Sequence, residues 1–112
     1  MIASPPRKTA VITGSTSGIG RSIALHLARE HFNVVLNYSA DEEKAQKTLY
    51  LCQQEIAQVI LVKADVSRKA DVDHLMRTAV DTFGTLDVLI NNAARVQDKP
   101  IIEMTEEEWD RV

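Results

Sequence analysis

The feature that most constrains this 112-residue chain is a regular alternation of short β-branched apolar runs with longer stretches of helical apolar spacing. The runs predict strands at 10–13, 33–37, 59–63 and 87–91. The longer stretches predict helices at 18–30, 41–54 and 68–83, with a fourth helix beginning near Thr105. The apolar runs 34–36 and 60–62 are continuous, which is typical of strands covered on both faces of a parallel sheet.

Strand–helix alternation of this kind predicts parallel strands joined by right-handed crossovers. The expected fold class is therefore α/β, a partial Rossmann-type doubly wound sheet of about four strands in the order 3-2-1-4. Residues 1–112 form one domain in this interpretation. The order reverses between the first and fourth strands, and ligands of such folds bind outside the carboxyl ends of the strands at that switch.

Local patterns predict how the helices pack and end. On the first helix, Gly20, Ala24 and Ala28 form a small-residue stripe that allows close approach to the sheet, with Ile19, Ile23 and Leu27 as the adjacent apolar stripe. The second helix is expected to place Ala45, Leu49 and Cys52 on one face. The third has an apolar stripe at Val72, Leu75, Met76, Ala79, Val80 and Phe83. Ser67 is its predicted N-cap and Gly84 its predicted C-cap.

Composition excludes several classes of function. The formal net charge is −3, so the chain has no basic surplus for a nucleic-acid partner or an anionic membrane. Cys52 is the single cysteine, which excludes an internal disulfide and a cysteine-based zinc site. No segment reads as a signal peptide or as a membrane span. His26, His31 and His74 lack ligand-like spacing, so no metal is expected, and the compartment is expected to be cytoplasmic.

The stretch between the first strand and the first helix is rich in glycine. It reads Thr13-Gly14-Ser15-Thr16-Ser17-Gly18-Ile19-Gly20. Gly14 permits a tight turn directly after the strand, Gly18 allows a diphosphate to approach the backbone, and Gly20 permits close packing of the helix on the strand. The helix N-terminus then offers unpaired N–H groups to an anion. The spacing is neither that of the G-x-G-x-x-G fingerprint nor that of a P-loop.

Two further motifs follow later strands. Asp65-Val66 comes after the third strand, and Asn91-Asn92-Ala93-Ala94 after the fourth. Together with Thr-Gly-x-x-x-Gly-x-Gly, they closely resemble the short-chain dehydrogenase/reductase family over nearly the whole chain, from Lys8 to Val112. Within the family, the sequence is most similar to bacterial 3-oxoacyl-carrier-protein reductases and glucose dehydrogenases. It departs from the family pattern at Ala94, where glycine is usual.

The resemblance implies a nicotinamide dinucleotide cofactor and a role for each matched position. Gly14, Gly18, Ile19 and Gly20 would cradle the pyrophosphate, and the hydroxyls of Ser15 and Ser17 would add donors. Asp65 would accept a hydrogen bond from the adenine amino group, and the Val66 backbone would contact the ring. Asn91 would stabilise the sheet, while Asn92, Ala93 and Ala94 would pass the ribose.

The second strand bears on the choice between NADP and NAD. An NAD site usually has an acidic residue directly after this strand, where it binds the ribose 2′-OH. Here that position lacks an acid, and Asn37-Tyr38-Ser39 resembles the NADP-accepting pattern of the family. Tyr38 and Ser39 are therefore the expected ribose-side contacts, and NADP is preferred over NAD. Lys44 and Arg21 are the cations considered as partners of a 2′-phosphate.

No catalytic residue is assigned to this chain. The family uses a serine and a Tyr-x-x-x-Lys pair, whereas Tyr38 and Tyr50 are followed four residues later by Glu42 and Gln54. The leading hypothesis is the N-terminal cofactor-binding portion of an NAD(P)-dependent oxidoreductase that reduces a small-molecule carbonyl or oxidises an alcohol. Such a portion is expected to be inactive by itself, and a homo-oligomer is expected only for a longer chain.

Two alternatives remain open at this point. One is a non-catalytic dinucleotide-binding module, and the other is a gene fragment without function. In every case the fourth strand is expected to form an exposed sheet edge with apolar surface beside it, which predicts poor solubility of the isolated chain.

Overall fold

A computed structural model describes residues 7–16 and 18–92 of the chain. Within them, strands and helices alternate along the sequence. The elements are β1 (Thr9–Thr13), α1 (Gly18–Arg29), β2 (Asn33–Tyr38), α2 (Glu42–Gln53), β3 (Val59–Lys63), α3 (Lys69–Phe83) and β4 (Val88–Asn91). The predicted strands and helices are all present in this region, with bounds that differ by one residue at most at each end.

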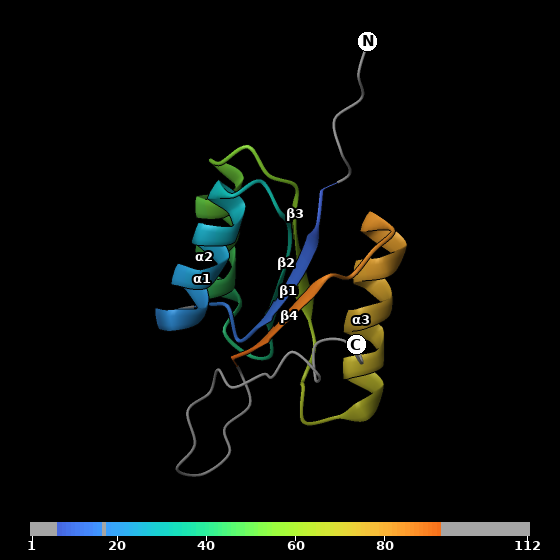
Figure 1. The fold of residues 1–112 in the computed structure, drawn as a ribbon. Coiled ribbons are helices and arrows are strands. Elements are labelled where there is room, and N and C mark those ends of the chain that lie inside the picture. Colours follow the sequence, from blue (N-terminus) through green and yellow to red (C-terminus); the bar gives the residue numbers. More distant parts are fainter. Residues whose placement is uncertain (1–6, 17, 93–112) are drawn as a thin grey trace.

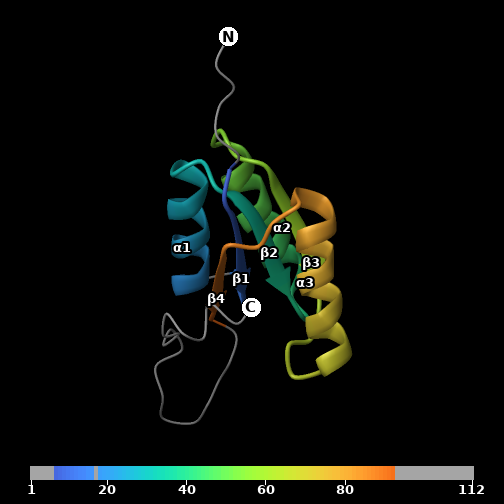
Figure 2. The ribbon, with the colours of Figure 1, turned by 45° about the vertical axis from the view of Figure 1, so that its right-hand side comes forward.

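The four strands form one parallel sheet in the order β3-β2-β1-β4. The predicted order and the Rossmann-type architecture are thereby confirmed. Helices α1 and α2 cover one face of the sheet and α3 covers the other (Figure 1). The view in Figure 2 shows β4 at the edge next to β1, on the side away from β2. All the strands run in one direction, so their carboxyl ends meet at the same edge of the sheet.

The core lies in two layers, one on each face of the sheet. Alternate residues of β1 supply both layers, because neighbouring side chains of a strand point to opposite faces. Ala10 and Ile12 pack with the α1–α2 layer, and Val11 packs with the α3 layer. The small-residue stripe of α1 is buried as predicted, so this helix lies close to β1 and β2. Cys52 is fully buried in the same layer.

The structure corrects two local predictions. Arg68, and not Ser67, is the N-cap residue of α3, and its side chain makes no capping hydrogen bond. The Ser67 hydroxyl instead donates to Asp65 Oδ1 at 2.6 Å, a local bond to the carboxylate two residues earlier. On α2, the predicted face is present, since Ala45 and Cys52 are buried and Leu49 packs against the core layer that contains Cys52; Thr48 is fully buried as well.

The second correction concerns the apolar stripes. Val80 is 43% exposed and Ile19 is 61% exposed, so neither side chain belongs to the core. Both lie on the β4 side of their helices, where no described element packs over them. The predicted C-cap is confirmed, since Gly84 is left-handed with φ 82° and its N–H donates to the Val80 carbonyl.

Some predictions concern residues outside the described part of the chain. The fourth helix near Thr105 lies there, as do the candidate site residues Ser17, Ala93 and Ala94. Among the residues that the structure does describe, no helix is long and apolar enough to span a membrane. The same residues contain no cluster of three or more His, Cys, Asp or Glu side chains with metal-binding geometry.

Candidate functional site

The glycine turn is packed too tightly for larger residues at its end. A Cβ atom added to Gly20 would overlap the Gly14 carbonyl oxygen, and it would lie 2.5 Å from Asn92 Nδ2 and 3.0 Å from Ser15 Cα. Gly14 and Gly18 have φ values of 60° and 58°, in the left-handed region that favours glycine. Each glycine of the motif is therefore required by backbone geometry, as the sequence predicts.

Asn92 ties the turn to the end of β4. Its side-chain Nδ2 donates to the Gly14 carbonyl at 3.0 Å, across the boundary between the first and fourth strands. Within the described residues, its Oδ1 atom is buried and accepts no hydrogen bond. Asn91 links the same two strands, because Thr13 Oγ1 donates to Asn91 Oδ1 at 3.1 Å. The structural role expected of Asn91 is thus present in the geometry.

Asn37 connects the turn to two further strands, and the sequence pattern did not single it out for this role. Its Oδ1 accepts from the Gly14 N–H at 3.2 Å. Its Nδ2 donates to the carbonyls of Ala64 at 3.0 Å and Val62 at 3.3 Å. The side chain is 2% exposed. An asparagine at a strand end is a common turn residue, so only its burial in three dimensions marks it as a hub.

Ser15 completes this hub. Its hydroxyl accepts from the Asn37 N–H at 2.9 Å and donates to the Asn37 carbonyl at 3.3 Å, and its own N–H also donates to that carbonyl. The N–H groups of Gly14 and Ser15 are therefore already engaged. The donors that remain for an anion are the N–H groups in the first turn of α1, from Gly18 to Gly20, which lack intrahelical acceptors.

A polar cavity of about 350 Å³ opens beside the turn, at the carboxyl ends of β1, β2 and β3. Its volume lies within the range of roughly 300–1,000 Å³ that is typical of small-molecule sites. Seven residues line it: Gly14, Asn37, Ser39, Ala64, Asp65, Val66 and Ser67. Four predicted site residues, Gly14, Ser39, Asp65 and Val66, are thereby brought together from three different loops.

The Asp65 carboxylate has its orientation fixed by its neighbours. Its Oδ1 accepts from both the hydroxyl and the N–H of Ser67, at 2.6 and 2.9 Å, and these bonds are the main reason that the pKa of Asp65 lies below its ordinary value. The nearby Arg68 charge acts in the same direction, against a small opposing effect of desolvation. Asp65 is therefore ionised at neutral pH and is available as an acceptor at the rim of the cavity.

The remaining predicted residues are placed less uniformly. Gly18 and Ile19 are exposed at the start of α1. Tyr38 is partly buried at the end of β2, where its hydroxyl donates to Glu42 Oε1 at 3.2 Å. Burial and the Glu42 charge both raise the pKa of Tyr38, so its hydroxyl is protonated at neutral pH. Of the two candidate cations, Lys44 Nζ lies 3.9 Å from Asp41 Oδ2, and Arg21 donates to backbone carbonyls.

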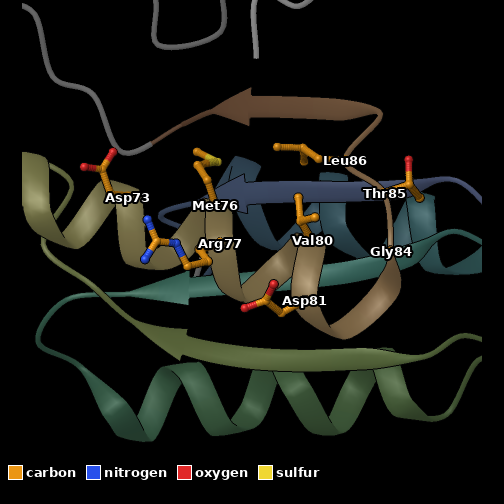
Figure 3. A pocket seen from close by; sticks show the side chains of 8 residues that line it. All are labelled: Asp73, Met76, Arg77, Val80, Asp81, Gly84, Thr85 and Leu86. Carbon is orange, nitrogen blue, oxygen red and sulfur yellow. The ribbon is translucent and has the colours of Figure 1, made fainter.

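Two larger hollows flank β4 and are mainly apolar. One, of about 710 Å³, lies between α1 and β4 and includes Ile19, Ile23 and Ile90. The other, of about 640 Å³, lies beside α3, from which Met76 and Val80 project toward Leu86 and β4 (Figure 3). The hollow between α1 and β4 also includes Gly18 of the glycine turn, but neither hollow includes Asp65 or Asn37. We therefore place the candidate site at the smaller, polar cavity.

The glycine turn lies where the strand order reverses, between β1 and β4, and the polar cavity lies beside it at the carboxyl ends of β1, β2 and β3, an arrangement typical of doubly wound α/β folds. The family model described as short chain dehydrogenase matches residues 8–112. The chain belongs to the short-chain dehydrogenase family. The resemblance drawn from the three motifs is confirmed by this match.

Two curated relatives illustrate the likeness. Glucose 1-dehydrogenase 2 of Bacillus subtilis is 43% identical over 107 residues, a match that covers 94% of this chain and 41% of the relative. A 3-oxoacyl-[acyl-carrier-protein] reductase of Staphylococcus epidermidis is 38% identical over 105 residues, covering 94% of this chain and 43% of the relative. The chain thus spans about two fifths of the length of these curated relatives.

Solved structures give the same result. A short-chain dehydrogenase/reductase of Serratia marcescens superposes with a TM-score of 0.77 at 31% identity, covering 95% of this chain and 43% of that one. A short-chain dehydrogenase/reductase from Burkholderia phymatum, solved in complex with NAD, gives a TM-score of 0.73 at 39% identity, covering 79% of this chain and 31% of that one.

Proposed function

We propose that residues 1–112 form the NAD(P)-binding domain of an oxidoreductase that interconverts a small-molecule carbonyl and an alcohol. The observation that carries this proposal is the contact of Gly20 with Gly14 and Asn92, directly beside the cavity that contains Asp65. One part of this arrangement suits a diphosphate and the other suits a purine. Their separation along one sheet edge suits a single dinucleotide that lies across both.

The residues present fit such a cofactor. The first turn of α1 offers N–H groups at the positive end of the helix dipole, which favours the pyrophosphate. The Asp65 carboxylate suits the adenine amino group, and the Val66 backbone suits the ring. Ser39 and Tyr38 lie on the side where the adenosine ribose would be held. A bound nicotinamide would supply the hydride, while this chain binds and orients the adenosine end and the pyrophosphate.

Two of the named proteins support the class of reaction and cofactor. The relative from Bacillus subtilis is called a glucose dehydrogenase, and the structure from Burkholderia phymatum was solved with NAD. Among the described residues, neither tyrosine has a lysine four positions later, so we propose no acid–base role for any of them.

For the choice of dinucleotide we propose NADP over NAD. No carboxylate directly follows β2, and the nearest acid in sequence, Asp41, uses Oδ1 to cap the N–H of Lys44 at 3.0 Å. A 2′-phosphate beside Ser39 would therefore meet the N-terminal end of α2, whose dipole favours an anion. Glu42 and Glu43 in the same first turn oppose this preference, so the expected difference in affinity is small.

Calorimetric titration with NADP, NAD and nicotinamide mononucleotide tests the proposal. Both dinucleotides should bind, and the mononucleotide, which lacks adenosine, should bind far more weakly. A ligand at about 100 times its dissociation constant should stabilise the fold by roughly 2.7 kcal/mol. Asp65→Ala should weaken both dinucleotides, whereas Asp73→Ala, which removes an exposed acid on α3, should not. Absence of dinucleotide binding would contradict the proposed function.

A further inference from the structure

Arg21 and Thr48 lie on different helices and converge on one carbonyl of the glycine turn. Thr16 O accepts from Arg21 Nη2 and from Thr48 Oγ1, the latter at 3.0 Å. Arg21 Nε also donates to Thr48 Oγ1 at 2.8 Å. A residue of α1 and a residue of α2 therefore hold the same atom of the turn, and they also hold each other.

Both side chains are committed to this contact. Thr48 is fully buried, and its Oγ1 also lies 3.2 Å from the Lys44 carbonyl one turn earlier on α2. Arg21 makes a further bond of 3.3 Å to that Lys44 carbonyl. Its guanidinium thus contacts two backbone carbonyls and a hydroxyl, and neither ion pair in the described residues includes it.

The orientation of the Thr16 carbonyl matters for anion binding at this turn. A carbonyl oxygen carries partial negative charge, so it repels a phosphate if it rotates toward one. Two donors on Thr16 O hold it toward α2 and offset that charge. The Asn37–Ser15 hub holds only the preceding residues, Gly14 and Ser15. Without Arg21 and Thr48, no described hydrogen bond would fix the Thr16 carbonyl.

We propose that Arg21 and Thr48 are positioning residues, which prepare the glycine turn for the pyrophosphate by holding Thr16, and that Arg21 does not itself bind phosphate. The inference rests on the proposed function, because it requires a diphosphate at the turn. It predicts that damage to this pair weakens ligands that contain a pyrophosphate and spares ligands that contain adenosine alone.

The experiment compares ADP with adenosine on matched threonine variants of the 112-residue chain. Thr48→Val keeps the shape of the side chain and removes its hydroxyl. Thr78→Val is the control, because Thr78 Oγ1 likewise donates to the carbonyl four residues earlier, His74 O, at 2.7 Å, but lies on α3 away from the turn. Thr48→Ser restores the hydroxyl. Arg21→Ala provides a second variant at a partly exposed position, should Thr48→Val fold poorly.

Thr48→Val and Arg21→Ala should each weaken ADP by about three- to tenfold, as expected for the loss of one or two hydrogen bonds. Adenosine should bind with unchanged affinity, Thr48→Ser should recover ADP binding, and Thr78→Val should leave both ligands unaffected. Equal weakening of ADP and adenosine, or no weakening of either, would overturn the inference. If the unaltered chain bound neither ligand, the proposed function would fail first.

Discussion

The sheet edge that carries the glycine turn and the flank of β4 are built in opposite ways. At the first, polar groups of Asn37, Ser15 and Asn92 join the carboxyl ends of all four strands in one hydrogen-bonded arrangement. At the second, apolar side chains such as Ile19 and Val80 stay exposed on either side of β4. Both regions adjoin β4.

The contrast lies in the kind of contact that each region makes among the described residues. At the turn and the Asp65 cavity, polar groups and backbone atoms from several loops pack closely together. The β4 flank exposes apolar surface that remains uncovered by any described element. Substitutions at the turn should therefore change stability and ligand binding, whereas substitutions on the flank should change association.

The largest expected effect is at Gly20. Gly20→Ala places a Cβ against the backbone at Gly14 and Ser15 and against the Asn92 amide, where relief requires the turn to move. We expect the free energy of unfolding to fall by about 3 kcal/mol, measured by urea denaturation. Gly18→Ala is the control: it meets no atom within 4 Å but has φ 58°, and it should cost about 1 kcal/mol. Equal losses of unfolding free energy for the two variants would contradict the tight packing of the turn around Gly20.

The second-largest loss of unfolding free energy is expected at Asn37. Asn37→Ala leaves the Gly14 N–H and the Ala64 carbonyl without their partner. Because these buried groups are left unsatisfied, we expect the free energy of unfolding to fall by about 2–3 kcal/mol. The control is Asn33→Ala at the opposite end of β2, where Nδ2 donates to Thr9 Oγ1 at 3.2 Å; it should cost about 1 kcal/mol. A cost at Asn33 as large as that at Asn37 would contradict the role of Asn37 as a hub.

The flank should respond differently. The double variant Ile19→Lys with Val80→Lys replaces two exposed apolar side chains, so it should change the unfolding free energy by less than about 0.5 kcal/mol. Sedimentation velocity should show less self-association than in the unaltered chain, because the exposed apolar area shrinks. A large loss of stability would instead mean that these side chains are covered in solution.

The smallest effect concerns pH. The pKa of Asp65 is lowered in the folded protein, chiefly by Ser67. A depressed carboxyl pKa stabilises the fold above its ordinary value, and this contribution is lost as pH falls through the folded pKa. Ser67→Ala should raise the pKa of Asp65, as followed by the carboxyl carbon shift in NMR. As the pH is lowered, adenosine binding to this variant should therefore begin to weaken at a higher pH than adenosine binding to the unaltered chain. An unchanged Asp65 pKa would exclude the Ser67 hydroxyl as the main cause.

Much of the fold could be predicted because the determining signals are local. Continuous apolar runs specify covered strands, and glycine spacing specifies a turn that opens a helix. The hub at Asn37 could not be predicted, since its partners come from β1 and β3 and only the strand register brings them together. Ser67 was assigned wrongly as a cap because its hydroxyl can either accept from the helix N–H groups or donate to a nearby carboxylate, and in the structure it donates to Asp65.

The residues of the candidate site also differ in how far the sequence could predict their surroundings. The positions of Gly14, Gly20 and Asp65 could be predicted because each belongs to a motif that requires its residue type for one steric or chemical reason. Ser15 looked like a phosphate donor, but its hydroxyl is buried in bonds to Asn37, which a hydroxyl-rich stretch does not reveal. The exposure of Ile19 and Val80 also escaped prediction, because helical periodicity marks an apolar face without indicating what covers it.

Backbone amide shift mapping during titration with NADP tests the central claim most directly. The account predicts that saturable changes concentrate at Gly18–Gly20 and at Asp65–Val66, while α3 near Ala79 stays unchanged. Changes confined to α3 and Leu86, or to only one of the two predicted segments, would contradict a dinucleotide that spans the turn and the Asp65 cavity.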